Sequence, residues 1–213
     1  MQQTPSIGRP RNERRHKAIL ETAIDLVVEL GFRAVSIESL AAKTGVAKTT
    51  IYRRWPNKAA VVMDAFMERL SGTQFPPHRR AIESVRLQMH SMARAFRSAD
   101  GVVLKGLIAE AQFDPELATA IRERWTLPRR KLALTVFQQA ITQGELRSDI
   151  DLEATIDLLY APMYYRLQMG TGPLSDAYID KIFDQVMEGL LQRRDRTQKD
   201  AKRGVSVQNH YQS

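Results

Sequence analysis

The sequence predicts an all-α protein of nine or ten helices, with a small N-terminal head and a larger helical body. Apolar residues recur at steps of three and four along nearly the whole chain, which is the period of an amphipathic helix. No alternating run of apolar and polar residues is long enough to suggest a β-strand. Glycine, proline and short polar residues interrupt the periodic stretches, so they mark the ends of the expected helices.

The head begins with a helix in which Ile19, Ala23 and Leu30 share one face, and Gly31 ends it. Ser36 is suited to cap a second helix over residues 37–43. After the break at Thr44-Gly45, a third helix is expected over 46–54, and a longer fourth one over 58–70. The breaker cluster at 71–77 then links head to body, which gives a head domain of residues 12–72.

The body, residues 78–192, continues the same pattern. Caps are expected at Asp114, at Asp151 or Asp149, and at Ser175, and helix stops at Gly144 and Gly170. Pro128 is expected to start a new helix. The predicted helices cover 82–97, 102–112, 116–124, 128–143, 152–169 and 178–192. Residues 1–11 and 193–213 lack an amphipathic pattern and are predicted to be disordered basic tails.

Composition excludes several classes of protein. The chain has 213 residues, 43% of them hydrophobic, which excludes disorder throughout. It has no cysteine, so a disulfide scaffold, a thiolate zinc site and a cysteine nucleophile are excluded. The first fifteen residues are polar and basic, unlike a secretory signal, and charges interrupt every long apolar stretch. We therefore expect a cytoplasmic protein.

The formal charge of +8 is unevenly distributed. Residues 1–60 hold 11 basic and 5 acidic side chains, residues 61–191 hold 15 and 17, and residues 192–213 hold 6 and 2. This pattern suggests a polyanion-binding head on a nearly neutral body. Solvated basic tails would give a similar distribution, so charge alone leaves nucleic-acid binding open.

The most informative segment is 37–56, where two short helices flank a glycine turn. Leu40 and Ala41 face inward on the first helix, and Val46 and Ile51 on the second. Gly45 can adopt the positive-φ conformation of a tight turn, and this spacing is typical of a helix-turn-helix. The alternative is an ordinary helical hairpin with a solvated face. The outward positions of the second helix are polar or basic: Lys48, Thr49, Thr50, Arg53 and Arg54.

Residues 16–62 resemble the DNA-binding domain of tetracycline-repressor (TetR) type regulators. The matching motifs are Ile19-Leu20-x-x-Ala23, Gly31-Phe32, Ser36-Ile37, Leu40-Ala41, Gly45-Val46, Thr50-Ile51-Tyr52 and Trp55-x-Asn57-Lys58. Trp55 stands where the family more often has Phe. The body resembles a C-terminal domain of this family through Ala109–Leu117, Pro128-Arg129-Arg130, Gly144-Glu145-Leu146-Arg147 and Met163-Tyr164-Tyr165-Arg166.

Physical chemistry then suggests roles within the helix-turn-helix. Its second helix should enter the major groove, where Arg53 can donate two hydrogen bonds to guanine and the methyl groups of Thr49 and Thr50 can contact thymine. For each of these residues, the alternative is a solvated side chain. The expected phosphate contacts are Ser36, Lys48, Tyr52 and Lys58, and the family resemblance implies this role for Ser36, Tyr52 and Lys58. Arg54 is a further expected DNA contact.

A second DNA-binding signal lies at the N-terminus. In Gly8-Arg9-Pro10-Arg11, the proline is expected to hold the backbone extended, so that Arg9 and Arg11 could follow a narrow minor groove. The segment resembles the core of an AT-hook, although a plain basic arm fits equally well. The C-terminal tail is expected to be solvated, with an auxiliary DNA contact as the alternative.

The sequence contains no motif that supports catalysis, metal binding or cofactor binding. The histidines His16, His78, His90 and His210 are scattered, and neither a nucleophile elbow nor a glycine-rich phosphate loop is present. The acidic pairs at 114/116 and 149/151 stand at helix starts, where carboxylates favour the helix dipole. We therefore expect no enzyme activity, no metal and no cofactor.

The resemblance implies that the body holds a small-molecule effector whose binding releases DNA. Large apolar and aromatic residues are candidates to line its pocket, but each fits an ordinary core position as well. Few ionisable groups interrupt these faces, which favours a mostly apolar effector. The rings of Trp125, Tyr160 and Tyr164 carry polar groups that need partners. The candidates are Met92, Phe96, Leu107, Trp125, Phe137, Tyr160, Met163 and Tyr164.

The last two helices, 152–168 and 178–192, are apolar on more than one stripe, so we expect them to pair with their copies in a homodimer. The alternative is that they only close the core of a monomer. Two copies of the helix-turn-helix would then read a palindromic operator on double-stranded DNA. The sequence thus predicts a dimeric transcriptional regulator, most simply a repressor released by an effector. The rival hypotheses are a ligand-independent architectural DNA-binding protein and an enzyme or carrier with an incidental basic head.

Overall fold

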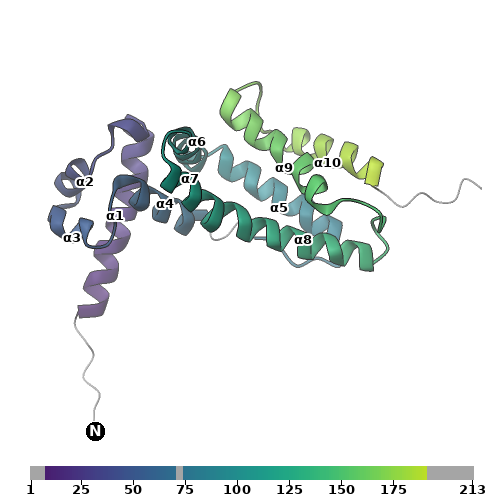
Figure 1. The fold of residues 1–213 in the computed structure, drawn as a ribbon, viewed down its shortest axis with the longest axis horizontal. Coiled ribbons are helices and arrows are strands. Elements are labelled where there is room, and N and C mark those ends of the chain that lie inside the picture. The colour runs from purple at the N-terminus through teal and green to yellow at the C-terminus, as the bar shows by residue number, and fades with distance from the viewer. Residues whose placement is uncertain (1–7, 71–73, 191–213) are drawn as a thin grey trace, which may run out of the picture.

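The structure is a computed structural model that describes residues 8–70 and 74–190, with the side chains of 13–70 and 74–189. The described residues form ten α-helices and no β-strand, which confirms the predicted all-α fold. Figure 1 shows a small head at one end and a body of long helices that extends away from it.

The head consists of α1, η1, α2 and α3, and its helix-turn-helix has the local structure that the sequence predicts. The Ser36 side chain caps α2 by accepting a hydrogen bond from the Ser39 backbone N–H at 3.0 Å. Gly45 ends α2 with φ of +67°, the left-handed conformation that glycine adopts without steric cost. The elements are α1 (Gly8–Leu30), the 3₁₀-helix η1 (Phe32–Ala34), α2 (Ile37–Thr44) and α3 (Lys48–Tyr52).

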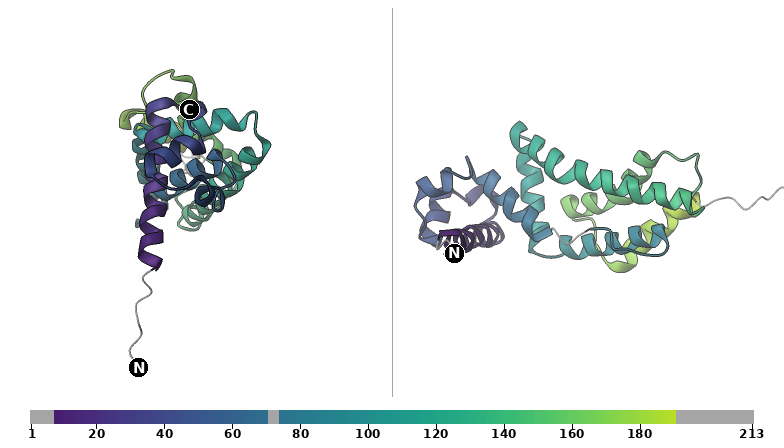
Figure 2. Two further views of the ribbon diagram at one scale, coloured as in Figure 1. Left: turned by 90° about the vertical axis from the view of Figure 1, so that its left-hand side faces the viewer. Right: turned by 90° about the horizontal axis from the view of Figure 1, so that it is seen from below.

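The first helix differs from the prediction at its N-terminus. It begins at Gly8, so residues 8–11 are helical rather than extended, and the first half of α1 projects beyond the rest of the head (Figure 2). Pro10 is compatible with this position because the first N–H groups of a helix have no intrahelical acceptor. The predicted tails at 1–7 and 193–213 and the side chains of Arg9 and Arg11 lie outside what the structure describes.

The body follows α4, which leads out of the head. Figure 1 shows α5, α8, α9 and α10 running along its length, with α6 and α7 next to the head. Gly106 of α6 lies so close to η1 that a Cβ there would be 2.9 Å from the Cβ of Phe32. The elements are α4 (Lys58–Arg69), α5 (Ala81–Phe96), α6 (Ala99–Ala111), α7 (Pro115–Ile121), η3 (Arg122–Thr126), α8 (Leu127–Thr142), α9 (Leu152–Met169) and α10 (Asp176–Leu190).

The helix ends of the body have the expected caps. Asp114 Oδ1 accepts hydrogen bonds from the backbone N–H groups of Glu116 and Leu117, each at 3.0 Å. Asp151 Oδ1 accepts one from the Ala154 N–H, also at 3.0 Å. Both aspartates therefore act as caps, as the sequence indicated.

One predicted break is wrong. Pro128 does not start a separate helix, because α7 continues into α8 through η3, a five-residue π-helical segment. The Leu127 N–H donates to the Arg122 carbonyl, five residues earlier, instead of four. Pro128 has no N–H to offer the carbonyl four residues before it, and the wider turn accommodates this loss without ending the helix.

Candidate DNA-binding surface and ligand cavity

The surface formed by α3 and the two residues that follow it carries six of the predicted DNA contacts as exposed or half-buried side chains. The Tyr52 side chain is 47% exposed, Thr50 is half-buried, and Ile51 points inward and is completely buried. The buried Ile51 side chain thus fixes this five-residue helix so that its polar side chains face outward. The other exposed members of this surface are Lys48, Thr49, Arg53 and Arg54.

Both lysines among the predicted phosphate contacts have partners within the head. Lys48 Nζ lies 3.0 Å from a Glu38 carboxylate oxygen, and the hydrogen bond from Lys48 lowers the pKa of Glu38. Lys58 Nζ donates to the carbonyl oxygens of Phe32 at 3.1 Å and Arg33 at 3.0 Å. Lys58 therefore ties the start of α4 to η1, a role that the sequence did not suggest.

Trp55 connects the end of the helix-turn-helix to the body. Its indole is buried and stacks on His16, with ring centroids 5.2 Å apart, and its Nε1–H donates to Asp64 Oδ2 at 2.7 Å. The other oxygen of the same carboxylate accepts a hydrogen bond from Arg124 of η3. Asp64 of α4 thus bridges the head and the π-helical segment. The indole N–H makes this possible, and the more usual phenylalanine would have no donor there.

The body contains a partly open cavity of about 410 Å³ bordered by α5, α6, η3, α8 and α9. Of the predicted effector contacts, Met92, Trp125, Tyr160 and Tyr164 line it. The other four, Phe96, Leu107, Phe137 and Met163, are buried in the surrounding core and are not among its lining residues. The complete lining is Phe75, Gln88, Met92, Leu104, Ile108, Ile121, Trp125, Thr126, Arg129, Arg130, Ala133, Ile156, Asp157, Tyr160, Ala161 and Tyr164.

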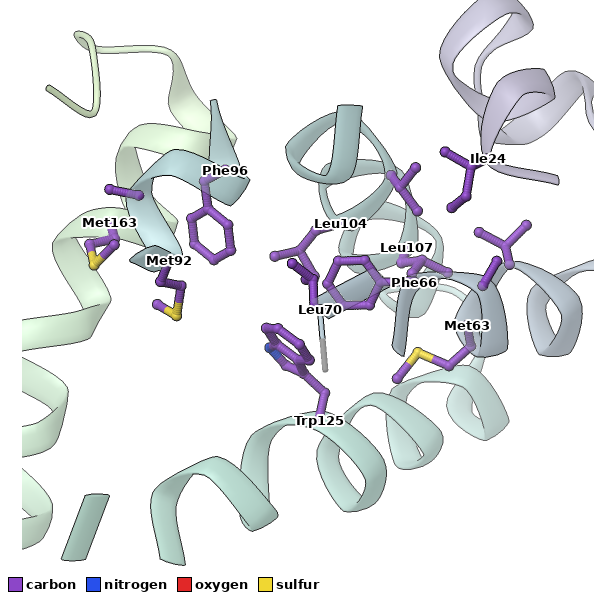
Figure 3. Close-up of a cluster of buried hydrophobic side chains, with 14 of the residues drawn as sticks. Ile24, Met63, Phe66, Leu70, Met92, Phe96, Leu104, Leu107, Trp125 and Met163 are labelled. Carbon is purple, nitrogen blue, oxygen red and sulfur yellow. The ribbon is translucent and has the colours of Figure 1, made fainter. Parts of the chain in front are cut away.

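Figure 3 shows how one wall of the cavity meets α4. The Trp125 indole reaches from its helix toward Phe66 and Leu70, with Met92 on the side of α5. The rings of Phe66 and Trp125 are tilted against each other with centroids 4.7 Å apart. A side chain that lines the cavity therefore packs directly on the helix that leads to the head.

The polar groups of the aromatic rings have the partners that the sequence led us to expect. Trp125 Nε1–H donates to the Tyr164 hydroxyl at 2.9 Å, and the Tyr160 hydroxyl donates to Gln88 Oε1 at 2.6 Å. Burial raises the pKa of both tyrosines, so both hydroxyls stay protonated at neutral pH. The cavity wall thus holds polar groups that remain uncharged.

Two arginines in the cavity wall, Arg129 and Arg130, were not predicted as site residues. Arg129 Nη2 donates to the Leu70 carbonyl at 3.1 Å, and its guanidinium carbon lies 3.4 Å from the centroid of the Trp125 ring. Burial lowers the pKa of Arg129 to about 10. Arg130 instead forms salt bridges with Glu153 and Asp157. Helical periodicity alone does not show that two adjacent arginines contact such different groups.

Comparison with known proteins identifies the two regions. A family model described as "Bacterial regulatory proteins, tetR family" matches residues 19–65. A second, described as "Tetracyclin repressor-like, C-terminal domain", matches residues 75–186, more than half of the chain. This chain belongs to the TetR family. It is a helix-turn-helix transcriptional regulator and not an enzyme.

Individual TetR-family proteins match over most of their length. The uncharacterized HTH-type transcriptional regulator YdeS of Bacillus subtilis is 38% identical over 184 residues, which cover 86% of this chain and 93% of YdeS. The DNA-binding transcriptional repressor TetR of Mycobacteroides abscessus is 29% identical, with coverage of 85% and 96%. The crystal structure of the TetR family regulator SCO0332 superposes with a TM-score of 0.69 at 28% identity, covering 84% of this chain and 99% of SCO0332.

Residues 8–70 and 74–190 contain no group of three or more His, Cys, Asp or Glu side chains that could hold a metal ion. None of the helices within these ranges is long and apolar enough to cross a membrane.

Proposed function

We propose that this TetR-family regulator is a homodimeric cytoplasmic repressor that leaves a palindromic operator when a small, mostly apolar ligand enters the cavity of the body. In this proposal residues 12–72 bind DNA and residues 78–192 bind the effector and the second copy. The observation that carries it is the combination of an exposed polar recognition helix with a cavity whose wall packs against α4, the helix leading to that recognition helix.

DNA recognition in this proposal rests on α3. Arg53, Thr49 and Thr50 contact base edges in the major groove, and the remaining residues contact phosphates. Lys48 is half exposed, so exchanging Glu38 for a phosphate costs little. The remaining proposed contacts are Ser36, Lys48, Tyr52, Arg54 and Lys58, with Arg9 and Arg11 of α1 as additional ones.

Dimerisation in this proposal uses α9 and α10. On α9, Leu158, Tyr165 and Met169 are 58%, 57% and 67% exposed, and with Ala161 they form a stripe at helical spacing. A second copy packed on this stripe would bury it in a four-helix interface. Two recognition helices spaced about 34–36 Å apart would then read one turn of DNA.

Ligand and DNA are coupled in this proposal through α4. Its Asp64 holds both Trp55 of the head and Arg124 of η3, and its Phe66 packs on Trp125 in the cavity wall. A ligand that displaces Trp125 would therefore move α4 and change the spacing of the two recognition helices. It releases DNA only if it binds the released spacing more tightly than the DNA-bound one.

The experiment that tests this proposal selects bound sites from random duplex DNA at near-physiological salt and repeats the binding over a salt series. We expect a palindrome, with affinity that falls steeply as salt rises because phosphate contacts release counterions. Salt-sensitive binding without a sequence motif would instead support the ligand-independent architectural alternative. Failure to bind any DNA at low salt would overturn the proposal.

A further inference from the structure

The three charged side chains of the cavity lining already have partners within the protein. Arg130 and Asp157 form a salt bridge with each other. Arg129 donates to the Leu70 carbonyl and lies over the Trp125 ring. A charged ligand would have to separate one of these groups from its partner, or enter the cavity without a partner of its own, and both cost free energy. The lining therefore favours a ligand without charge.

The uncharged polar side chains of the lining are linked to one another. The Tyr160 hydroxyl donates to Gln88 Oε1 at 2.6 Å, and the Gln88 amide donates to Met92 Sδ at 3.8 Å. Trp125 Nε1–H donates to the Tyr164 hydroxyl oxygen at 2.9 Å. Two acceptor oxygens of the wall, those of Gln88 and Tyr164, are thus already in use.

Tyr164 retains one donor for a ligand. Its hydroxyl oxygen accepts the bond from Trp125, and its own proton has no acceptor among the residues that the structure describes. Burial raises the pKa of Tyr164, whereas the indole hydrogen bond and the positive charge of Arg129 act to lower it. The group therefore stays protonated, and a hydroxyl that accepts such a bond becomes a better donor. The wall offers this polarised proton to an acceptor atom in the cavity.

The remainder of the lining suits an apolar ligand body. Met92 lines the cavity from α5, Leu104 and Ile108 line it from α6, and Ile156 lines it from α9. The volume of about 410 Å³ lies within the usual range for small-molecule sites.

We propose that the effector is an uncharged, largely apolar molecule with a carbonyl group, whose oxygen accepts a hydrogen bond from the Tyr164 hydroxyl. A carbonyl brings an acceptor and no donor, which matches a wall that offers a proton and whose Gln88 and Tyr164 oxygens are already engaged. This inference rests on the proposed function, because it names the ligand class of the same cavity. It also brings the ligand to the coupling contact, since Tyr164 holds Trp125, and Trp125 packs on Phe66 of α4.

Four ligands with ten carbon atoms test the head group: 2-decanone, 2-decanol, decanoate and decylammonium. Binding to the full chain at pH 7 is followed through tryptophan fluorescence, because Trp125 lines the cavity. We expect 2-decanone to bind about three- to tenfold more tightly than 2-decanol, because the proton of the alcohol has to compete for an acceptor that is already in use. Both ions should bind at least about tenfold more weakly than the ketone. Equal or tighter binding of the alcohol or of either ion, or no binding of the ketone, would overturn the inference.

The infrared carbonyl band of bound 2-decanone tests the role of Tyr164 directly. A hydrogen bond lowers the stretching wavenumber of a carbonyl, so the band should lie below that of the ketone in hexane, where no donor is present. This measurement needs no variant. A band at the hexane position in the unchanged chain would contradict the assignment.

A matched pair of variants assigns the donor. Tyr164→Phe alone would free the Trp125 N–H to replace the hydroxyl, so the pair compared is Trp125→Phe and the double variant Trp125→Phe, Tyr164→Phe. The carbonyl band should stay low in the first and move to the hexane position in the second. Tyr165→Phe, which removes an exposed hydroxyl from the same helix, is the control and should change nothing. A low band that persists in the double variant would show that another group is the donor.

Operator binding distinguishes failure of the inference from failure of the proposed function. If 2-decanone binds through Tyr164 but operator affinity does not change, the ligand class stands and the repressor mechanism fails. If another of the four ligands releases the operator while the ketone is not preferred, the mechanism stands and the ligand class fails.

Discussion

The head places its functional side chains on the outside and fills its interior, whereas the body leaves a cavity in its interior. In the head, Leu40, Ile51 and Trp55 are buried, and they hold the exposed residues of α3 in place. In the body, Trp125 and Ile156 are equally buried from solvent but border about 410 Å³ of unfilled space. The same kind of apolar residue therefore determines stability in one region and the shape of a cavity in the other.

A matched pair of isoleucine substitutions tests this difference most strongly. Ile51→Ala in the head should lower the free energy of unfolding by about 2–5 kcal/mol, because it opens a hole in a filled core. Ile156→Ala should lower the free energy of unfolding by clearly less, toward the lower end of that range, since part of the Ile156 side chain already borders a cavity. Urea unfolding followed by circular dichroism measures both. Equal losses for the two variants would contradict the comparison.

The next prediction concerns the surface of the head. Arg53→Ala should reduce affinity for the selected operator by about 1–3 kcal/mol per half-site and relax the preference at one base position, because a bidentate base contact is lost. Its free energy of unfolding should stay within about 0.5 kcal/mol of the unchanged chain, since Arg53 is exposed. Fluorescence anisotropy with labelled operator measures the affinity. Arg122→Ala, which removes an exposed arginine from the body, serves as the control.

A substitution at Asp64, which links the head to η3, is expected to change stability less than the substitutions above. Asp64→Asn removes the charge that Arg124 pairs with and leaves an amide near Trp55, so we expect a loss of about 1 kcal/mol in stability. The operator affinity lost on adding a saturating ligand should also decrease, because α4 no longer ties the cavity wall to the head. Glu21→Gln, at an exposed ion pair on α1, is the control. Unchanged ligand response in Asp64→Asn would show that the coupling runs elsewhere.

The smallest effect is expected at acidic pH, on the outer side of the body. Partial burial acts to raise the pKa of Asp180, but hydrogen bonds from His90 and Arg86 lower it below 3.8 overall. The carboxylate therefore stabilises the folded state above about pH 4, and this contribution is lost as pH falls through the lowered pKa. Asp180→Asn should flatten the decline of stability below pH 4. Urea unfolding at a series of pH values measures it, and an unchanged slope would contradict the assignment.

The head could be predicted largely from its sequence because its signals are local. Ser36 caps the helix that follows it, Gly45 adopts the turn conformation that only glycine adopts easily, and Ile51 lies at a fixed spacing from both. Each of these features depends on residues within one or two turns. The same holds for the aspartate caps of the body.

The cavity could not be predicted in the same way because it depends on packing between distant helices. Met92 and Phe96 are four residues apart on one face of α5, yet only Met92 lines the cavity. Arg129 and Arg130 are adjacent, and the difference between them depends on Glu153 and Asp157 of another helix. Helical period identifies an inward face but does not show whether that face meets another side chain or empty space.

The π-helical segment η3 sets the rotation about the helix axis of the residues that link the cavity to the head. A π-turn spans five residues where an α-turn spans four, so everything that follows it is rotated by about 100° relative to a continuous α-helix. In this register Arg124 reaches Asp64 while its neighbour Trp125 borders the cavity. Deleting a single codon, that of Glu123, should restore an ordinary helix and rotate Arg124 and Trp125 together by about 100° relative to α7. In the proposed coupling, the presence of one residue in the gene therefore decides which side chains of this helix face Asp64 and the cavity, without a change in any contact residue.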